Sequence, residues 1–120
     1  MAMDKDVAAI WDAVSQAAGA VTTSAAVDLR LAYEAALSIK VTNGATGPTV
    51  AAIVQIQVSE DNSEWYNFGG ALQSTLGNSV ETSWGAIDLP SAVNYVRVVG
   101  SANTGQTVTL NADISYVVAI

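Results

Sequence analysis

The sequence contains no cysteine and no histidine among its 120 residues. Without cysteine the chain can form neither a disulfide nor a thiolate metal site. Without histidine it lacks the commonest general base and the commonest transition-metal ligand. It also has no Gly-x-Ser-x-Gly elbow and no P-loop lysine motif. We therefore expect no cofactor, no metal centre and no enzymatic activity.

Charged residues are also scarce, at 12% of the chain, against roughly 25% in an average globular protein. Eleven carboxylates outnumber four basic groups, so the net charge is −7. The basic residues are Lys5, Arg30, Lys40 and Arg97. A negative charge of this size repels phosphate backbones and anionic lipid headgroups. We expect neither nucleic acid nor membrane as a partner.

Long apolar runs are missing as well. No stretch approaches the roughly 20 apolar residues of a membrane span. Near the N-terminus the apolar run at 7–11 has five residues, whereas a signal peptide needs about seven or more. We expect no secretion signal. The length of 120 residues is typical of one domain with a single core.

The first 20 residues show helical periodicity. The apolar residues at this spacing include Val7, Ile10, Trp11 and Val14. Aspartates precede them, where they would cap a helix. The pattern predicts a short amphipathic α-helix over 4–18, within an N-terminal helical arm at 1–20. A helix of about 13 residues is marginal alone in water. Its apolar stripe is therefore expected to pack on its own domain or to dock on a partner, such as a second copy in a homo-oligomer.

After residue 20 the apolar residues recur with a period of two, which is typical of strands. The clearest alternating runs are 37–41, 54–58 and 108–118, and shorter strands are expected at 22–29, 65–68, 80–87 and 93–99. Turn signals such as Asn43-Gly44 and Gly47-Pro48 separate them. This spacing predicts an all-β domain over 21–120, a two-sheet antiparallel β-sandwich with a jelly-roll-like arrangement.

Trp65 and Tyr66 adjoin a turn and are candidate glycan contacts, because aromatic faces suit the apolar faces of sugar rings. The alternative is that Trp65 is buried at one end of the sandwich. Neighbouring strand residues point to opposite faces, so we expect only one of the two to be buried. The acidic turn at 60–64 has ligands that suit Ca²⁺ but not the spacing of an EF-hand loop. We favour a solvated hairpin turn there.

Two stretches resemble known families. The run at 54–66, VQIQVSEDNSEWY, followed by VNYVRVV at 93–99, resembles discoidin-like and related jelly-roll sandwiches. The chain from about 22 to 120 is similar to small β-sandwich structural proteins of tailed bacteriophages and prophages. The residues that carry this second resemblance are 37–44 with Gly47-Pro48, 54–65, 95–99 and 103–110.

The second resemblance implies a virion component, either a capsid decoration or head protein or a tail accessory protein. Such a protein would be assembled in the host cytoplasm, dock on capsid or tail subunits of the same virion and commonly form oligomers. One other hypothesis is a carbohydrate-binding module or host-glycan adhesin that uses Trp65 or Tyr66. Another is a non-viral assembly or scaffold domain.

Overall fold

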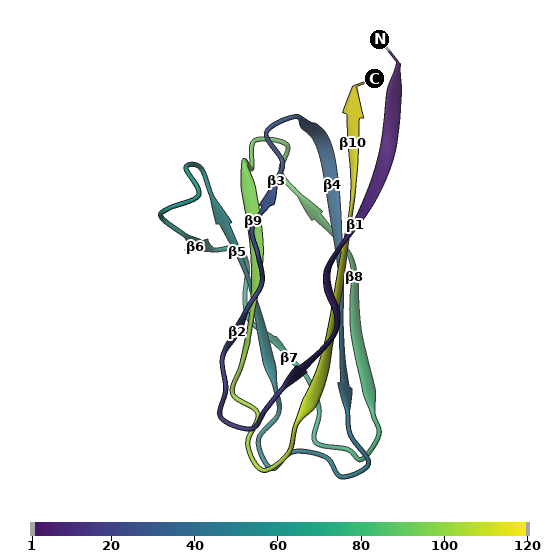
Figure 1. Cartoon of the computed structure of the whole chain (residues 1–120), viewed down its shortest axis with the longest axis vertical. Coiled ribbons are helices and arrows are strands. Elements are labelled where there is room, and N and C mark those ends of the chain that lie inside the picture. The colour runs from purple at the N-terminus through teal and green to yellow at the C-terminus, as the bar shows by residue number, and fades with distance from the viewer. Residues whose placement is uncertain (1, 120) are drawn as a thin grey trace.

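A computed structural model describes residues 2–119 as two antiparallel β-sheets packed face to face (Figure 1). Sheet A has the strand order β1-β10-β4-β8 and consists of β1 (Met3–Gln16), β10 (Val108–Ala119), β4 (Ala32–Asn43) and β8 (Glu81–Leu89). Sheet B is built around β5 (Ile53–Ser59) and β9 (Tyr95–Ser101). Two-residue strands flank this pair: β2 (Thr22–Thr23) and β3 (Val27–Asp28) on β9, β6 (Tyr66–Asn67) and β7 (Leu72–Gln73) on β5. The all-β prediction is confirmed.

Alternate residues of the long strands build the core between the sheets. In β10 the buried residues Leu110, Ala112 and Ile114 lie opposite buried residues of β4. Sheet B contributes its own buried set to the same core, including Val54, Ile56, Val96 and Val98. Residues in between, such as Thr109 and Asn111, point to the outer face. The period of two therefore identified the inward face of these strands correctly.

The predicted N-terminal helix over 4–18 is wrong, because these residues lie in the edge strand β1, antiparallel to β10. Two bulges explain part of the helical pattern, the step from Trp11 to Val14. One adds a residue between Ala9 and Trp11, and the other adds a residue between Trp11 and Val14. The residues opposite buried positions of β10 are Ala8, Trp11, Val14 and Gln16. Their spacing of three, three and two resembles one face of a helix.

The second bulge is held by a side chain of the neighbouring strand. Ala13 adopts a positive φ of 49°, and its backbone N–H donates to Asn111 Oδ1 at 2.9 Å. A positive φ is costly for alanine, so this hydrogen bond helps to stabilise the bulged conformation. Asn111 therefore has a structural role on the outer face of sheet A.

Buried amides join the end of β1 to the loop between β9 and β10. The side-chain amides of Gln16 and Asn103 are fully buried. Their nearest polar atoms lie 2.6 Å apart. Asn103 Nδ2 also donates to the backbone carbonyls of Gln16 at 3.2 Å and Gln106 at 2.9 Å. Buried polar groups need such partners, and this cluster fixes the point where the chain leaves sheet A for sheet B.

The molecule is elongated, with principal extents of 50 × 27 × 19 Å. Both ends of the chain lie at the same end of the sandwich, where β1 and β10 project beyond sheet B (Figure 1). Among residues 2–119 there is no helix long and apolar enough to cross a membrane.

Candidate binding surfaces

An apolar groove lies at the end of the sandwich that holds both chain ends. Its volume is about 500 Å³, and its lining residues are Arg30, Leu31, Ala32, Tyr33, Val118 and Ala119. Leu31 is 84% exposed, although leucine is usually buried. Met3 lies beside the groove, because it pairs with Ala119, and is also exposed. We call the surface formed by Met3, Leu31, Tyr33, Val118 and Ala119 the terminal end.

The four residues expected to form a docking stripe do not share one surface. Trp11 is only 3% exposed and belongs to the core. Ile10 and Val14 are half-buried and pack against that core. Val7 lies opposite Ser115 and is 71% exposed. The structure thus seats three of these side chains on their own sandwich and leaves Val7 available on the outside.

Trp65 lies on the outer face of sheet B, against Arg97. The Arg97 guanidinium carbon lies 4.3 Å from the centroid of the indole ring, within the range of a cation–π contact. Arg97 Nε donates to Gln57 Oε1 at 2.8 Å, and Gln57 Nε2 donates to Asn67 Oδ1 at 3.2 Å. Four side chains from β5, β6, β9 and the preceding turn therefore hold one another in place.

A second arginine stacks on the same face of sheet B. Arg30 lies 5.3 Å from the ring centroid of Tyr95, and Tyr95 is two residues before Arg97 on β9, so both side chains point outward. Arg30 also pairs with Asp28 at 2.7 Å. The hydrogen bonds from Arg30 lower the pKa of Asp28 to about 2. The surface made of Arg30, Tyr95, Arg97, Trp65, Gln57 and Asn67 is here named the arginine face.

Tyr66 points to the opposite side from Trp65, as expected for neighbouring residues. Trp65 is half-buried and Tyr66 is exposed, so the prediction that one of the two is buried is wrong. Tyr66 lies opposite Val58 in the β5–β6 pair, is 61% exposed, and its hydroxyl donates to Glu64 Oε2 at 3.1 Å. Its ring lines a cleft of about 180 Å³ together with Val58 and Val93. Trp65 and Tyr66 therefore do not form one platform.

The turn at 60–64 is organised by its own backbone. Asp61 Oδ1 accepts hydrogen bonds from the N–H groups of Ser63 at 2.9 Å and Glu64 at 3.0 Å. These bonds lower the pKa of the Asp61 carboxyl. The carboxylate thus serves as a turn cap. Within residues 2–119 no group of three or more acidic side chains is placed to hold a metal ion.

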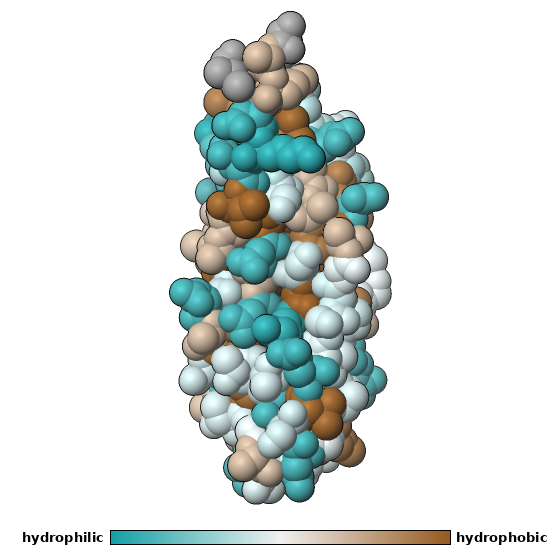
Figure 2. All heavy atoms as spheres, turned by 90° about the vertical axis from the view of Figure 1, so that its right-hand side faces the viewer, coloured by the Kyte–Doolittle hydropathy of each residue, from teal (hydrophilic) through white to brown (hydrophobic). Residues whose placement is uncertain are grey.

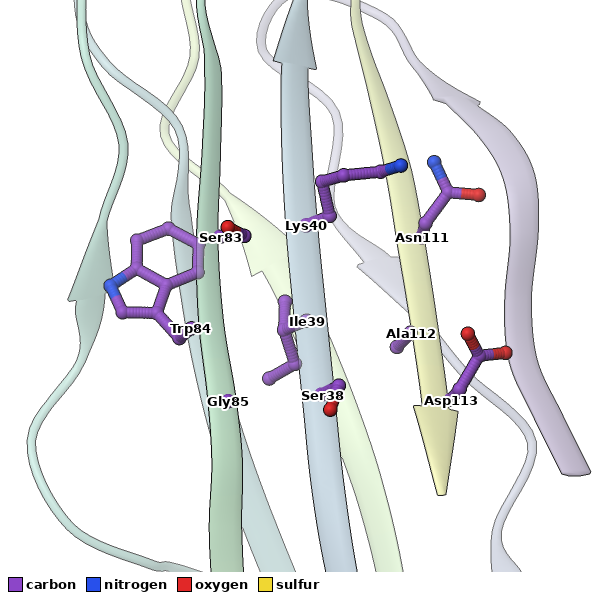
Figure 3. Close-up of a pocket in the computed structure, with 9 residues that line it drawn as sticks. All are labelled: Ser38, Ile39, Lys40, Ser83, Trp84, Gly85, Asn111, Ala112 and Asp113. Atoms are coloured by element: carbon purple, nitrogen blue, oxygen red, sulfur yellow. The ribbon is translucent and has the colours of Figure 1, made fainter. Parts of the chain in front are cut away.

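A shallow polar groove of about 430 Å³ crosses the outer face of sheet A. Lys40 extends toward Asn111, while Ser38 and Asp113 rise nearby (Figure 3). Lys40 also pairs with Glu81 at 3.3 Å, and Asn111 supports the bulge of β1. Figure 2 shows this side of the molecule as mainly hydrophilic and neutral, with scattered apolar patches. Two polar side chains of the groove, Lys40 and Asn111, are thus engaged in structural contacts.

Sequence reasoning missed Gln57, Asn67 and Leu31. Gln57 and Asn67 looked like ordinary polar positions of a strand, because their contacts with Arg97 and with each other join different strands. Leu31 follows Arg30 in a connection where no periodic pattern applies. An isolated leucine outside the alternating runs was the only signal that the sequence offered.

No family model matches the chain, and no curated protein matches it. Its fold is similar to solved viral structures. A chain of the infectious bursal disease virus Gx strain matches with a TM-score of 0.66 and 9% identity, over 97% of this chain and 32% of that chain. The VP2 subviral particle of the same virus matches with a TM-score of 0.61 and 8% identity, again over 97% and 32%. This chain therefore spans about a third of the length of those proteins.

The SPBc2 prophage-derived protein YomS is similar over almost its entire length. The match covers 98% of this chain and 96% of that chain, with a TM-score of 0.51 and 15% identity. At such identities the likeness shows the fold alone. The structural neighbours of the chain thus include viral proteins and a prophage-derived protein.

Proposed function

We propose that the chain is a structural protein of a bacteriophage virion with a jelly-roll-like sandwich. It acts as a capsid decoration or head protein, or as a tail accessory protein, and docks on capsid or tail subunits. The observation that supports this best is the likeness to prophage-derived YomS, which covers 98% of this chain and 96% of that chain. The sequence resemblance to small phage sandwiches supports the same role.

In this proposal the terminal end is the docking surface. At this end the large exposed side chains of Met3, Leu31 and Tyr33 lie in or beside an apolar groove. The outer face of sheet A is mainly polar. Contiguous exposed apolar surface commonly marks an interaction site. The projecting ends of β1 and β10 would reach a neighbouring subunit before the body of the sandwich does. Many copies on a symmetric particle would add their weak contacts into stable attachment.

We further propose that the protein acts by binding and performs no chemistry. In the polar groove of sheet A, Asn111 accepts a backbone hydrogen bond and Lys40 is paired with Glu81. Neither side chain is arranged as a nucleophile with a general base, which is the geometry that covalent catalysis requires.

Two exposed leucines at opposite ends of the sandwich test the docking surface. Leu31 lies at the terminal end, and Leu76, 54% exposed, lies in the loop between β7 and β8 near the other end. Purified protein is added to particles of the encoding phage from which its gene has been deleted, and co-sedimentation is measured. We expect Leu31→Asp to weaken attachment at least about tenfold, because a charge must then be buried, and Leu76→Asp to leave it unchanged.

The proposal fails if the wild-type protein does not sediment with the particles, or if mass spectrometry does not find it in wild-type virions. Equal attachment of the two aspartate variants would retain the virion role but exclude the terminal end as the docking surface.

A further inference from the structure

Over the described part of the chain, the arginine face holds one unpaired cation in an acidic protein. The net charge of the chain is −7, yet both of its arginines stack on aromatic rings on the outer face of sheet B. The two arginines differ in their partners. Arg30 gives its Nε and Nη2 hydrogen bonds to Asp28, so its charge is largely neutralised. Among residues 2–119 no carboxylate lies within ion-pair distance of Arg97.

The hydrogen bonds around Arg97 leave unused donors. Gln57 accepts from Arg97 Nε and donates to Asn67 Oδ1. The guanidinium Nη groups of Arg97 and the Nδ2 of Asn67 then have no acceptor among the described residues. Both ends of this chain of contacts therefore offer N–H groups. A cluster of free donors beside an unpaired cation favours an anionic ligand.

The arrangement is also held rigidly. Arg97, Gln57 and Trp65 are each half-buried, and Arg97 is fixed by the indole ring at 4.3 Å and by the amide of Gln57 at 2.8 Å. A guanidinium whose Nε is already bound presents its two Nη groups in a plane, which matches the two oxygens of a carboxylate. Binding would cost little side-chain ordering, because the arginine is already positioned.

We propose that the arginine face binds a carboxylate-bearing sugar, such as a uronate, through the free Nη groups of Arg97. Asn67 Nδ2 would donate to a neighbouring hydroxyl, and the exposed part of the Trp65 indole would contact the apolar face of the ring. The half-buried aromatic ring beside the donors favours an acidic sugar over an acidic side chain of a protein. Arg30 of the arginine face also lines the groove of the terminal end, but Arg97, Asn67 and Trp65 do not, so the sugar contact can be tested apart from docking.

The test is an NMR titration of the full ¹⁵N-labelled chain with tri-galacturonate. The methyl ester of the same trimer serves as the matched neutral probe. We expect saturable shifts in the Trp65 indole N–H, the Asn67 side-chain amide and the backbone around Arg97, and no saturable shifts with the ester. Shifts that are equal for acid and ester would refute recognition of the carboxylate, and no shifts at millimolar trimer would refute the site.

Charge-matched variants locate the contact. Arg97→Gln is expected to weaken binding of tri-galacturonate about tenfold or more, the loss that one charge-assisted pair of hydrogen bonds predicts. Arg97→Lys keeps the charge but loses the planar pair of donors, so it should also bind several-fold more weakly. Lys40→Gln removes one positive charge from the opposite sheet and should bind as the wild type does. Equal weakening in Arg97→Gln and Lys40→Gln would overturn the assignment.

An acidic peptide distinguishes the class of ligand. Tri-glutamate with an acetylated N-terminus and an amidated C-terminus carries three carboxylates, as tri-galacturonate does, but no sugar ring. We expect it to bind more weakly than tri-galacturonate. If the peptide binds equally well and depends equally on Arg97, the face recognises acidic protein segments and the sugar proposal is wrong. Circular dichroism of each variant checks that the fold is retained.

Discussion

The two sheets of this sandwich contribute to it in different ways. Sheet A consists of strands of 14, 12, 12 and 9 residues and presents a mainly polar outer face. Sheet B has two central strands of 7 residues and four strands of only 2 residues, and stacked arginine and aromatic side chains cover part of its outer face. Length and backbone pairing hold sheet A, whereas side-chain contacts supplement short strands in sheet B.

The edge strands of the two sheets also differ, in regularity and in length. β1, one edge of sheet A, carries two bulges, and the β4–β8 pair has a register shift near the other edge. Sheet B ends on both sides in two-residue strands. Bulges and very short strands both prevent a foreign strand from adding to an edge. The two sheets thus protect their edges against strand addition by two separate means.

The largest difference in the free energy of unfolding is expected between variants of the tryptophans of the two sheets. Trp11→Ala empties a buried position in sheet A, so we expect a loss of about 3–5 kcal/mol in the free energy of unfolding. Trp65→Ala removes a half-buried ring and one cation–π contact from sheet B, for about 1–2 kcal/mol. Urea denaturation measures both. Similar losses would mean that Trp65 is as important to the fold as the core residue.

Two glycines test how closely the sheets approach each other. A Cβ on Gly100 of β9 would lie 2.9 Å from Leu110 Cδ1 of sheet A and too close to the amide of Gln16. We expect Gly100→Ala to lower the free energy of unfolding by about 1–3 kcal/mol through overpacking. At Gly70 no heavy atom lies within 4 Å of the place that a Cβ would take. Gly70→Ala should change stability by less than about 0.5 kcal/mol, and an equal effect at both glycines would contradict the packing.

A smaller change, an increase in stability, is expected at the second bulge of β1. Ala13 has a φ of 49°, which glycine adopts without the steric cost that alanine bears. Ala13→Gly should therefore stabilise the protein by about 1 kcal/mol. Ala9→Gly, at a position of β1 without a positive φ, should destabilise it by about 0.5–1 kcal/mol. Thermal unfolding of both variants measures the difference, and two losses of equal size would argue against the bulge.

The weakest effect concerns the ion pair on sheet B. Because Arg30 lowers the pKa of Asp28 from 3.8 to about 2, the pair favours the folded state above pH 3.8 and loses its effect as the pH falls through about 2. The melting temperature of the wild type should exceed that of Asp28→Asn by a small, constant margin near neutral pH. This margin should shrink as the pH falls from 3.8 to about 2. A margin that does not depend on pH would exclude the ion pair as its cause.

Alternation of apolar and polar residues was enough to predict the long strands at 37–41, 54–58 and 108–118, and hence the all-β class. It failed for β1, because each bulge shifts the inward position by one residue and turns a period of two into steps of three. The predicted helix was therefore a consequence of backbone irregularity that composition does not reveal. Only the pairing of β1 with β10 distinguishes the two structures.

The candidate sites were predictable to a lesser degree. Trp65 was selected from the sequence as an aromatic residue beside a turn, and the structure places it on an outer face. Its partner Arg97 hydrogen bonds with Gln57, which is 40 residues away in the sequence. Contacts over such distances follow from the strand register, which a single sequence does not provide. The terminal end likewise exists only because β10 returns beside β1.

The most direct test of the virion role uses the two lysines of the chain, Lys5 and Lys40. Both are accessible. Lys5 lies on β1 beside the terminal end, whereas Lys40 lies on β4, three residues from its far end, and pairs with Glu81. Intact virions are treated with an amine-reactive cross-linker and analysed by mass spectrometry. We predict cross-links from Lys5 to a capsid or tail subunit and none from Lys40. Cross-links from Lys40 alone, or a virion that lacks the chain, would contradict the proposal.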